Sequence, residues 1–232
     1  MAGTARGEEP EMLLGALRQQ VVDVGLRALA VGVVHGTAGN MSLRDRETGL
    51  VAISPSGMPY PSVTAADVVV VDVDGIIRDG HRKPSSEMPL HTMIMKAHDR
   101  VGAIVHTHSH YSTVVSTIRD ELPPILTEVT QVIGPRVPVT RYGISGTPDF
   151  GASVLEALDD EGMAVLLRNH GLIAFGKDFD EALMVAGIVE EAAKVYVHAL
   201  AANGGREPRL VPANLIPGLR ARFVATYGQG TA

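Results

Sequence analysis

Two histidines, His106 and His108, follow a short apolar run over residues 101–105. The β-branched residues of this run predict a buried strand. Because side chains two residues apart on a strand point the same way, both imidazoles are expected on one face. Two imidazoles on one face form half of a metal site. His110 shares this spacing, but a helix that begins after His108 would turn it away.

A third histidine, His170, also follows an apolar strand pattern, over residues 164–167, and precedes Gly171. A glycine at that position allows another stretch of backbone to approach closely. Three neutral imidazoles with an open fourth position are typical of a catalytic zinc site. The chain has no cysteine, so thiolate ligands are excluded. We therefore rank His170 above His110 as the third ligand and predict one Zn2+ per subunit.

Glu87 follows two serines and opens a stretch with a helical pattern that runs to about His98. An acid in the first turn of a helix most often only stabilises the helix dipole. Close to a metal, the same carboxylate would act as a ligand and a general base. We predict that Glu87 has the role beside the metal and does not only stabilise the helix dipole. We treat His91, one helical turn further on, as a packing residue.

Three loops over residues 37–40, 54–57 and 85–86 are rich in small and polar residues. Each loop alone is most often only a turn. Together they offer hydroxyls, an amide and free backbone N–H groups, one set of them at a helix N-terminus, which suits a phosphate. The spacing is not that of a P-loop, and no G-x-G-x-x-G follows a strand, so a nucleotide is not indicated.

The bulk composition narrows the class of protein. The chain has 232 residues, 45% of them hydrophobic, which allows a substantial core. Its formal charge is −6 without a basic block, so nucleic-acid binding is disfavoured. No apolar run approaches the roughly 18 residues of a membrane span. The N-terminal residues lack the apolar core of a signal peptide, so we expect a cytoplasmic protein.

Strand and helix patterns alternate along the chain, and at least one pair of strands reads as a hairpin. This predicts an α/β fold with a mixed or mainly antiparallel sheet covered by helices in layers. We expect residues 1–10 to be a disordered terminus and 11–232 to form a single domain. Glu190 and Glu191 are expected to face solvent. The predicted helices span about 11–30, 87–98, 111–119, 149–158, 179–202 and 216–227, and the predicted strands span 41–44, 50–53, 68–73, 101–105, 137–139, 164–168 and 172–175.

Five short motifs occur in order along the chain: Thr37–Ser42, Ser54–Met58, Pro84–Glu87, His106–His108 and Asn169–Leu172. Together they resemble the class II, zinc-dependent aldolase/adducin family, with the L-fuculose-phosphate aldolases as the nearest branch. The resemblance covers roughly residues 11–200. It implies a three-layer α/β/α sandwich around a mainly antiparallel sheet, assembled as a homotetramer with sites between subunits.

The resemblance also implies a reaction. A phosphorylated ketose, similar to L-fuculose 1-phosphate, would be cleaved by a retro-aldol reaction to dihydroxyacetone phosphate and a short aldehyde. Glu87 would be the catalytic acid and base. The zinc ligands would be His106, His108 and His170, and the positions matching the phosphate site are Asn40, Ser56, Gly57, Ser85 and Ser86.

Other activities of the family remain open at this point. The methylthioribulose-1-phosphate dehydratases share the glutamate, whereas the sugar-phosphate 4-epimerases carry aspartate in its place. A non-catalytic, adducin-like role is disfavoured by the presence of the histidines and Glu87. The chain departs from the aldolases where they carry a tyrosine proton donor, because residues 126–129 contain none. Tyr142 and Tyr227 are the candidate substitutes, and the aldehyde end of the site is expected within 123–146 and 205–232.

Overall fold

The computed structural model describes residues 12–159 and 161–226. The predicted disordered terminus and Tyr227 therefore lie outside the described residues. None of the helices in the described ranges combines the length and the apolar character that a bilayer-spanning segment requires.

The centre of the fold is a seven-stranded sheet in which all strand pairs are antiparallel. A separate two-stranded sheet joins β6 (Glu121–Leu122) and β7 (Val137–Pro138). The predicted antiparallel character is confirmed. From one edge to the other, the strands are β4 (Ile77–Asp79), β3 (Val69–Val71), β2 (Val51–Ile53), β1 (Asn40–Arg44), β5 (Ala103–Thr107), β9 (Gly171–Gly176) and β8 (Ala164–Leu167).

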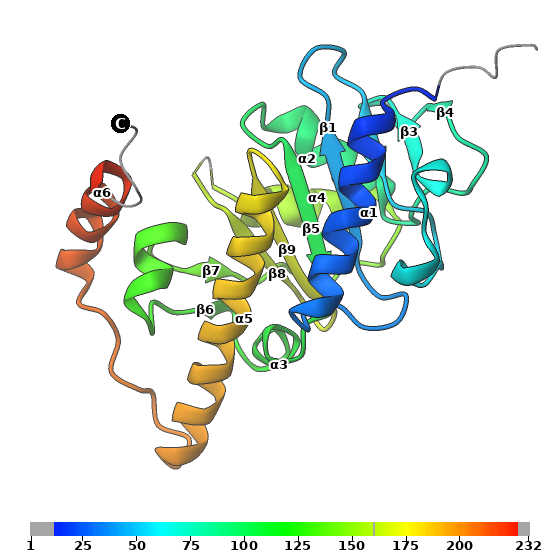
Figure 1. The fold of residues 1–232 in the computed structure, drawn as a ribbon. Coiled ribbons are helices and arrows are strands. Elements are labelled where there is room, and N and C mark those ends of the chain that lie inside the picture. The colour runs from blue at the N-terminus through cyan, green and yellow to red at the C-terminus, as the bar shows by residue number, and fades with distance from the viewer. Residues whose placement is uncertain (1–11, 160, 227–232) are drawn as a thin grey trace, which may run out of the picture.

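Helices cover both faces of this sheet (Figure 1). One hydrophobic cluster joins one face of the sheet to α1, α3 and α5, and a second joins the other face to α2 and α4. The predicted three-layer α/β/α arrangement is thus confirmed. The helices are α1 (Gly15–Ala30), α2 (Met88–Ala97), α3 (His110–Ile118), α4 (Pro148–Ala157), α5 (Phe179–Ala202) and α6 (Ile216–Thr226).

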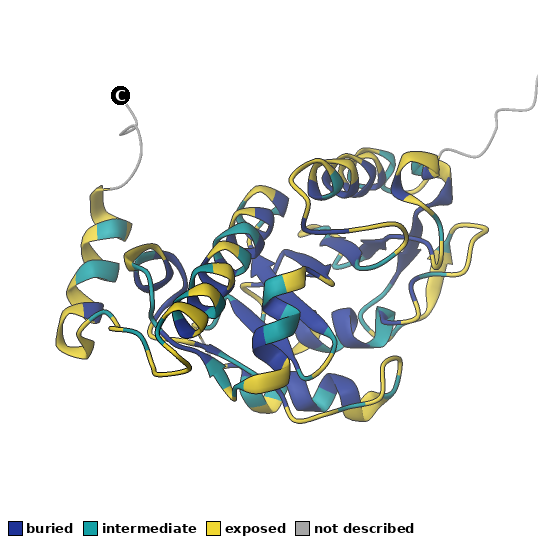
Figure 2. Ribbon diagram, turned by 90° about the horizontal axis from the view of Figure 1, so that it is seen from below, coloured by how far each residue is buried: buried dark blue, intermediate teal, exposed yellow. Residues whose placement is uncertain are grey.

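Alternation along the strands assigns each side chain to a layer. In β5, Val105 belongs to the cluster with α1 and α5, and Ile104 belongs to the cluster with α2 and α4. The strands are buried throughout the middle of the sheet, while the outward faces of the helices are exposed (Figure 2). His106 therefore lies on the same side as Ile104, facing the layer of α2 and α4.

The segment around residues 123–134, to which the sequence assigns no element, contains a short π-helix over Val129–Ile133. The C-terminal α6 packs against this π-helix. The guanidinium of Arg220 in α6 donates to the carbonyl of Val132, with 2.7 Å between nitrogen and oxygen. The pairing is long-range, which explains why local periodicity did not reveal it.

Candidate active site and metal centre

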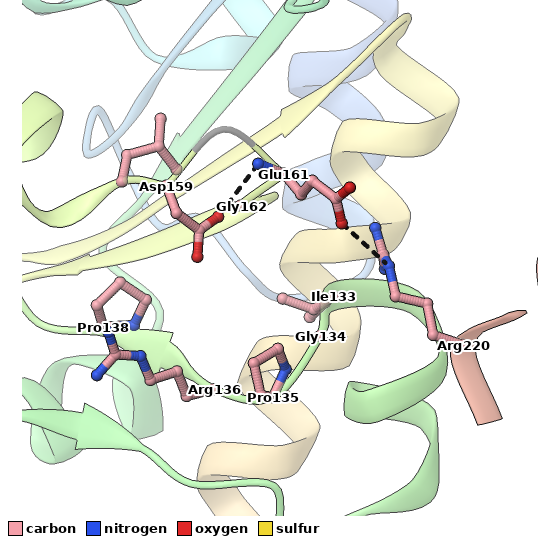
Figure 3. Close-up of a pocket in the computed structure, with 10 residues that line it drawn as sticks. Ile133, Gly134, Pro135, Arg136, Pro138, Asp159, Glu161, Gly162 and Arg220 are labelled. Atoms are coloured by element: carbon pink, nitrogen blue, oxygen red, sulfur yellow. Dashed lines mark hydrogen bonds and ion pairs between the residues drawn. The ribbon is translucent and has the colours of Figure 1, made fainter. Parts of the chain in front are cut away.

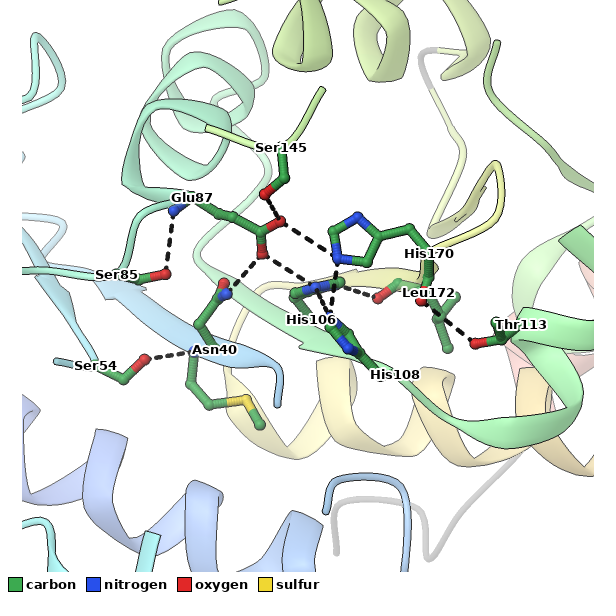
Figure 4. Close-up of polar contacts among 11 residues, drawn as sticks. Asn40, Ser54, Ser85, Glu87, His106, His108, Thr113, Ser145, His170 and Leu172 are labelled. Atoms are coloured by element: carbon green, nitrogen blue, oxygen red, sulfur yellow. Dashed lines mark hydrogen bonds and ion pairs between the residues drawn. The ribbon is translucent and has the colours of Figure 1, made fainter. Parts of the chain in front are cut away.

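The three predicted ligand histidines converge at one end of the sheet (Figure 4). The Nε2 atom of His108 lies 3.0 Å from Nε2 of His106 and 2.9 Å from Nε2 of His170. β5 and β9 are antiparallel neighbours, with Thr107 opposite Leu172, so the start of β9 lies beside the end of β5. This pairing brings His170 to the two histidines that end β5.

The tight turn between β8 and β9 sets the position of His170. Asn169 has a left-handed backbone, with φ of 59°, immediately before it. Gly171 follows His170 in the chain, and a Cβ added to it would lie only 2.2 Å from the carbonyl oxygen of Thr107. Only glycine fits this contact, so the expected close backbone approach at Gly171 is confirmed. From α4, Phe150 stacks on the His170 ring at 5.5 Å between centroids.

A hydrogen bond to the backbone fixes the tautomer of the His106 ring. Its Nδ1 lies 2.9 Å from the carbonyl oxygen of Leu172, which only accepts, so Nδ1 carries the proton. The Nε2 lone pair of a neutral His106 then faces the other two imidazoles. Nε2 of His108 holds at most one proton, and that proton satisfies only one of its two close nitrogen contacts. A cation at the centre would satisfy all three lone pairs.

The surroundings also favour the neutral forms of His108 and His170. Burial, together with the nearby His106 and His170 rings, lowers the pKa of His108 to about 4. Burial likewise lowers the pKa of His170, with a further contribution from His106. A metal binds the neutral form of imidazole, so the lowered pKa values favour metal binding at neutral pH. The residues present therefore fit a divalent ion of the zinc type.

His110 lies outside this group. It is the exposed first residue of α3, and its ring packs edge-on against Tyr111. The Glu190 carboxylate of α5 accepts the backbone N–H groups of Tyr111 and Ser112, at 2.9 and 2.8 Å. These are free donors at the start of α3, so Glu190 caps the helix that follows the histidines. The expectation that Glu190 faces solvent is wrong, whereas Glu191 is exposed as expected.

Glu87 lies beside the three imidazoles, just before α2 begins. Its Oε2 accepts a 2.8 Å hydrogen bond from the Asn40 amide and lies 3.1 Å from Nε2 of His106. Its Oε1 accepts a 2.6 Å hydrogen bond from the Ser145 hydroxyl and lies 3.5 Å from Nε2 of His170. Register explains the Asn40 contact, because Asn40 pairs with His106 across β1 and β5.

The Glu87 carboxyl is only 4% exposed, yet it is ionised. Burial by itself raises the pKa of Glu87. Hydrogen bonds from Ser145 and Asn40, and the charge of His106 whenever that ring takes up a second proton, outweigh burial and hold the pKa of Glu87 well below its usual range. At neutral pH the carboxylate is therefore available to accept a proton or to contact a cation.

His91 is a core residue, as expected. It is fully buried, and its Nδ1 lies 2.7 Å from the Ser42 hydroxyl of β1. Burial lowers the pKa of His91 to about 3, with a smaller contribution from His106, so the ring is neutral. This contact ties α2, and with it Glu87, to the central strand.

A cavity of about 170 Å³ opens next to Glu87, His108 and His170. Two of its loops are bound to each other, since the Ser56 N–H donates to Lys83 and the Ser85 N–H donates to Ser54. Its lining in the described chain contains neither lysine nor arginine. An anion here would rest on hydroxyls, backbone N–H groups and the N-terminus of α2. All five predicted phosphate-site residues line it: Asn40, Ser56, Gly57, Ser85 and Ser86.

Ser145 is the site residue that sequence reasoning missed. It lines the same cavity, and it belongs to a loop between β7 and α4 in which no motif was recognised. A serine in such a loop gives no periodic signal. Tyr142, a candidate proton donor, is in the same loop, but its side chain is 66% exposed and it does not line the cavity.

Comparison with known proteins identifies the family. The profile of the class II aldolase and adducin N-terminal domain matches residues 19–197, most of the chain. The chain belongs to this family. The recognition made from the five motifs is confirmed, and with it the prediction that this family member is an enzyme of the aldolase class.

Individual relatives support the assignment along nearly the whole chain. A 5-deoxy-D-ribulose 1-phosphate aldolase of Bacillus thuringiensis is 37% identical, over 94% of this chain and 100% of the relative. A 5-methylthioribulose-1-phosphate/5-deoxyribulose-1-phosphate aldolase of Rhodospirillum rubrum is 35% identical, over 92% of this chain and 93% of the relative. Among solved structures, an L-fuculose 1-phosphate aldolase superposes with a TM-score of 0.86 and 32% identity, over 93% and 100% of the two chains.

Proposed function

We propose that this protein is a zinc-dependent aldolase that cleaves a 1-phosphorylated ketose into dihydroxyacetone phosphate and a short aldehyde. The observation that carries the proposal is the convergence of three histidine Nε2 atoms, two of them within 3.5 Å of the Glu87 carboxylate, beside a cavity suited to a phosphate. A metal centre, a base and an anion site in contact are what this reaction requires.

The three histidines would hold the ion. When bound, the ion stabilises the negative charge that develops on the substrate oxygens as the C–C bond breaks. Glu87 moves the proton at the carbon that remains with the phosphate-bearing fragment. The cavity residues grip the phosphate and so place the reacting carbons within reach of Glu87. We assign this grip to Asn40, Ser56, Gly57, Ser85 and Ser86.

For the substrate, we propose 5-deoxyribulose 1-phosphate in preference to the L-fuculose 1-phosphate suggested by the sequence motifs. Two relatives that span nearly the whole chain carry 5-deoxyribulose 1-phosphate in their names. The aldehyde product would then be acetaldehyde. We further propose a homotetramer as the active form, to be tested by light scattering of the purified protein.

A substrate panel tests the proposal. The zinc-loaded protein is incubated with 5-deoxyribulose 1-phosphate, L-fuculose 1-phosphate, 5-methylthioribulose 1-phosphate and L-ribulose 5-phosphate, and all products are identified. We expect dihydroxyacetone phosphate from 5-deoxyribulose 1-phosphate at the highest kcat/KM. Unphosphorylated 5-deoxyribulose, the control, should not be cleaved.

Each other outcome overturns the proposal in a defined way. Loss of water from 5-methylthioribulose 1-phosphate without release of dihydroxyacetone phosphate would identify a dehydratase. Interconversion of L-ribulose 5-phosphate with its epimer would identify an epimerase. Full metal occupancy without turnover of any phosphorylated sugar would indicate a non-catalytic, adducin-like role.

A further inference from the structure

The two oxygens of the Glu87 carboxylate have chemically different partners. Oε2 accepts from the Asn40 amide nitrogen, a group that only donates. Oε1 accepts from the Ser145 hydroxyl, a group that both donates and accepts. When the imidazole lone pairs hold the cation, a proton on Oε2 would meet only the hydrogens of the Asn40 amide, whereas a proton on Oε1 meets an oxygen that can turn to accept it.

Exposure separates the two oxygens as well. Asn40 lines the same cavity but is only 7% exposed, and His106 is fully buried, so Oε2 is on the more buried side of the carboxylate. Ser145 is exposed and lines the cavity, so Oε1 is on the side from which a substrate arrives. Figure 4 shows Ser145 and Asn40 approaching the carboxylate from opposite sides. Of the hydroxyls that line the cavity in the described chain, only Ser145 bonds to this carboxylate.

The loop that carries Ser145 is held in place by its neighbours. The Thr147 hydroxyl donates to the carbonyl of Ile144 at 2.7 Å and also accepts from the backbone N–H of Phe150 at the start of α4. Arg141 binds both Asp149 and Glu156 of α4. These contacts fix the loop on α4, the same helix whose Phe150 stacks on His170.

We propose that Ser145 is a positioning residue that makes Oε1 the proton-carrying oxygen of Glu87. The inference rests on the proposed aldolase function and deepens it. While Glu87 is ionised, the Ser145 hydroxyl donates to Oε1. When Oε1 takes a proton from the substrate carbon or holds one for return to it, the hydroxyl rotates and accepts. One side chain thereby stabilises both states, and Asn40 keeps Oε2 aligned throughout.

The test compares two reactions of the zinc-loaded enzyme, C–C cleavage and exchange of solvent hydrogen into dihydroxyacetone phosphate. Both need proton transfer by Glu87. In Ser145→Ala, we expect kcat for cleavage and the exchange rate to fall together by about 10- to 150-fold, the range for a lost hydrogen bond to a charged group. KM and zinc content should stay within about threefold of wild type, because neither phosphate grip nor metal ligands change.

Two further variants keep the test decisive. Ser145→Thr retains a hydroxyl that donates and accepts, and should restore both rates to within about threefold of wild type. Thr147→Ala loosens the same loop without removing a partner of Glu87, and should slow both reactions less than Ser145→Ala does.

The inference is overturned if Ser145→Ala keeps the wild-type rates, if only its KM rises, or if Thr147→Ala is equally slow. A wild-type protein that catalyses neither cleavage nor exchange would instead overturn the proposed function. The two failures are therefore distinguishable.

Discussion

Two cavities lie at opposite ends of β8 and differ in kind. The distal cavity, lined by Asp159, Glu161 and Gly162 before the strand and by Arg220 of α6, has a volume of about 440 Å³ (Figure 3). The cavity beside His170, after the strand, has about 170 Å³. Apart from volume, the two cavities differ in how their polar groups are paired.

In the distal cavity, each prominent charge already has a partner. Arg220 donates to a backbone carbonyl and lies 4.0 Å from Glu161, and Arg136 binds Glu121 at 3.1 Å. Beside His170, by contrast, the Nε2 atoms of three imidazoles face one another, and their lone pairs are satisfied together only by a cation. Convergent groups of one kind, rather than volume, therefore mark the functional site.

The largest effect is expected from removing the base. Glu87→Gln should lower the rate of cleavage by about 10³-fold, within the usual range for a positioned general base, while zinc content persists. The matched control is Glu161→Gln in the distal cavity, which should stay within about twofold of wild type. Steady-state kinetics of both variants decide the matter, and comparable losses in the two would remove the distinction between the cavities.

The next effect concerns the turn that presents His170. In Gly171→Ala, the added Cβ meets the Thr107 carbonyl, so we expect unfolding free energy to fall by about 1–3 kcal/mol and zinc affinity to fall with it. Gly187→Ala is the control, since its Cβ meets nothing within 4 Å in α5 and should stabilise the helix by up to about 1 kcal/mol. Urea unfolding of both variants tests this, and equal stabilities would contradict the close approach.

A smaller effect is expected from pH. Unfolded chains protonate His91 near the ordinary histidine pKa of 6.5, whereas the folded metal-free protein keeps it neutral down to a pKa of about 3. Between these values the unfolded state binds more protons, so stability falls as pH falls, by about 1.4 kcal/mol per pH unit for this group. In denaturant unfolding at pH 7, 6 and 5, the unfolding free energy should depend less steeply on pH in His91→Gln than in wild type. An equal pH dependence of the unfolding free energy in wild type and His91→Gln would contradict this account of His91.

The smallest effect belongs to the distal cavity. Arg220→Ala should leave the cleavage rate within about twofold of wild type and lower stability by about 1–2 kcal/mol, because Arg220 donates to the Val132 carbonyl and pairs with a Glu161 that is 86% exposed. A tenfold loss of activity in this variant, measured on folded protein, would show that the far end of β8 communicates with the site.

Periodicity and short motifs predicted the layers and the cluster of three histidines, because both depend on local geometry. Alternation along β5 put His106 and His108 on one face, and glycine after His170 indicated a close approach. Ser145 and Glu190 were missed because each acts on a group far away in sequence, Glu87 in one case and the start of α3 in the other. Periodicity specifies which face a side chain takes, but not which distant group it will meet.

The most direct test of the central claim is metal content measured alongside cleavage. Wild-type protein is predicted to bind one Zn2+ per chain, to lose cleavage when a chelator removes it, and to recover when zinc returns. His106→Ala, which lacks the ligand fixed by the Leu172 carbonyl, is predicted to bind no stoichiometric zinc and to be inactive. Full cleavage by metal-free wild type, or one tightly held ion in His106→Ala, would contradict the account.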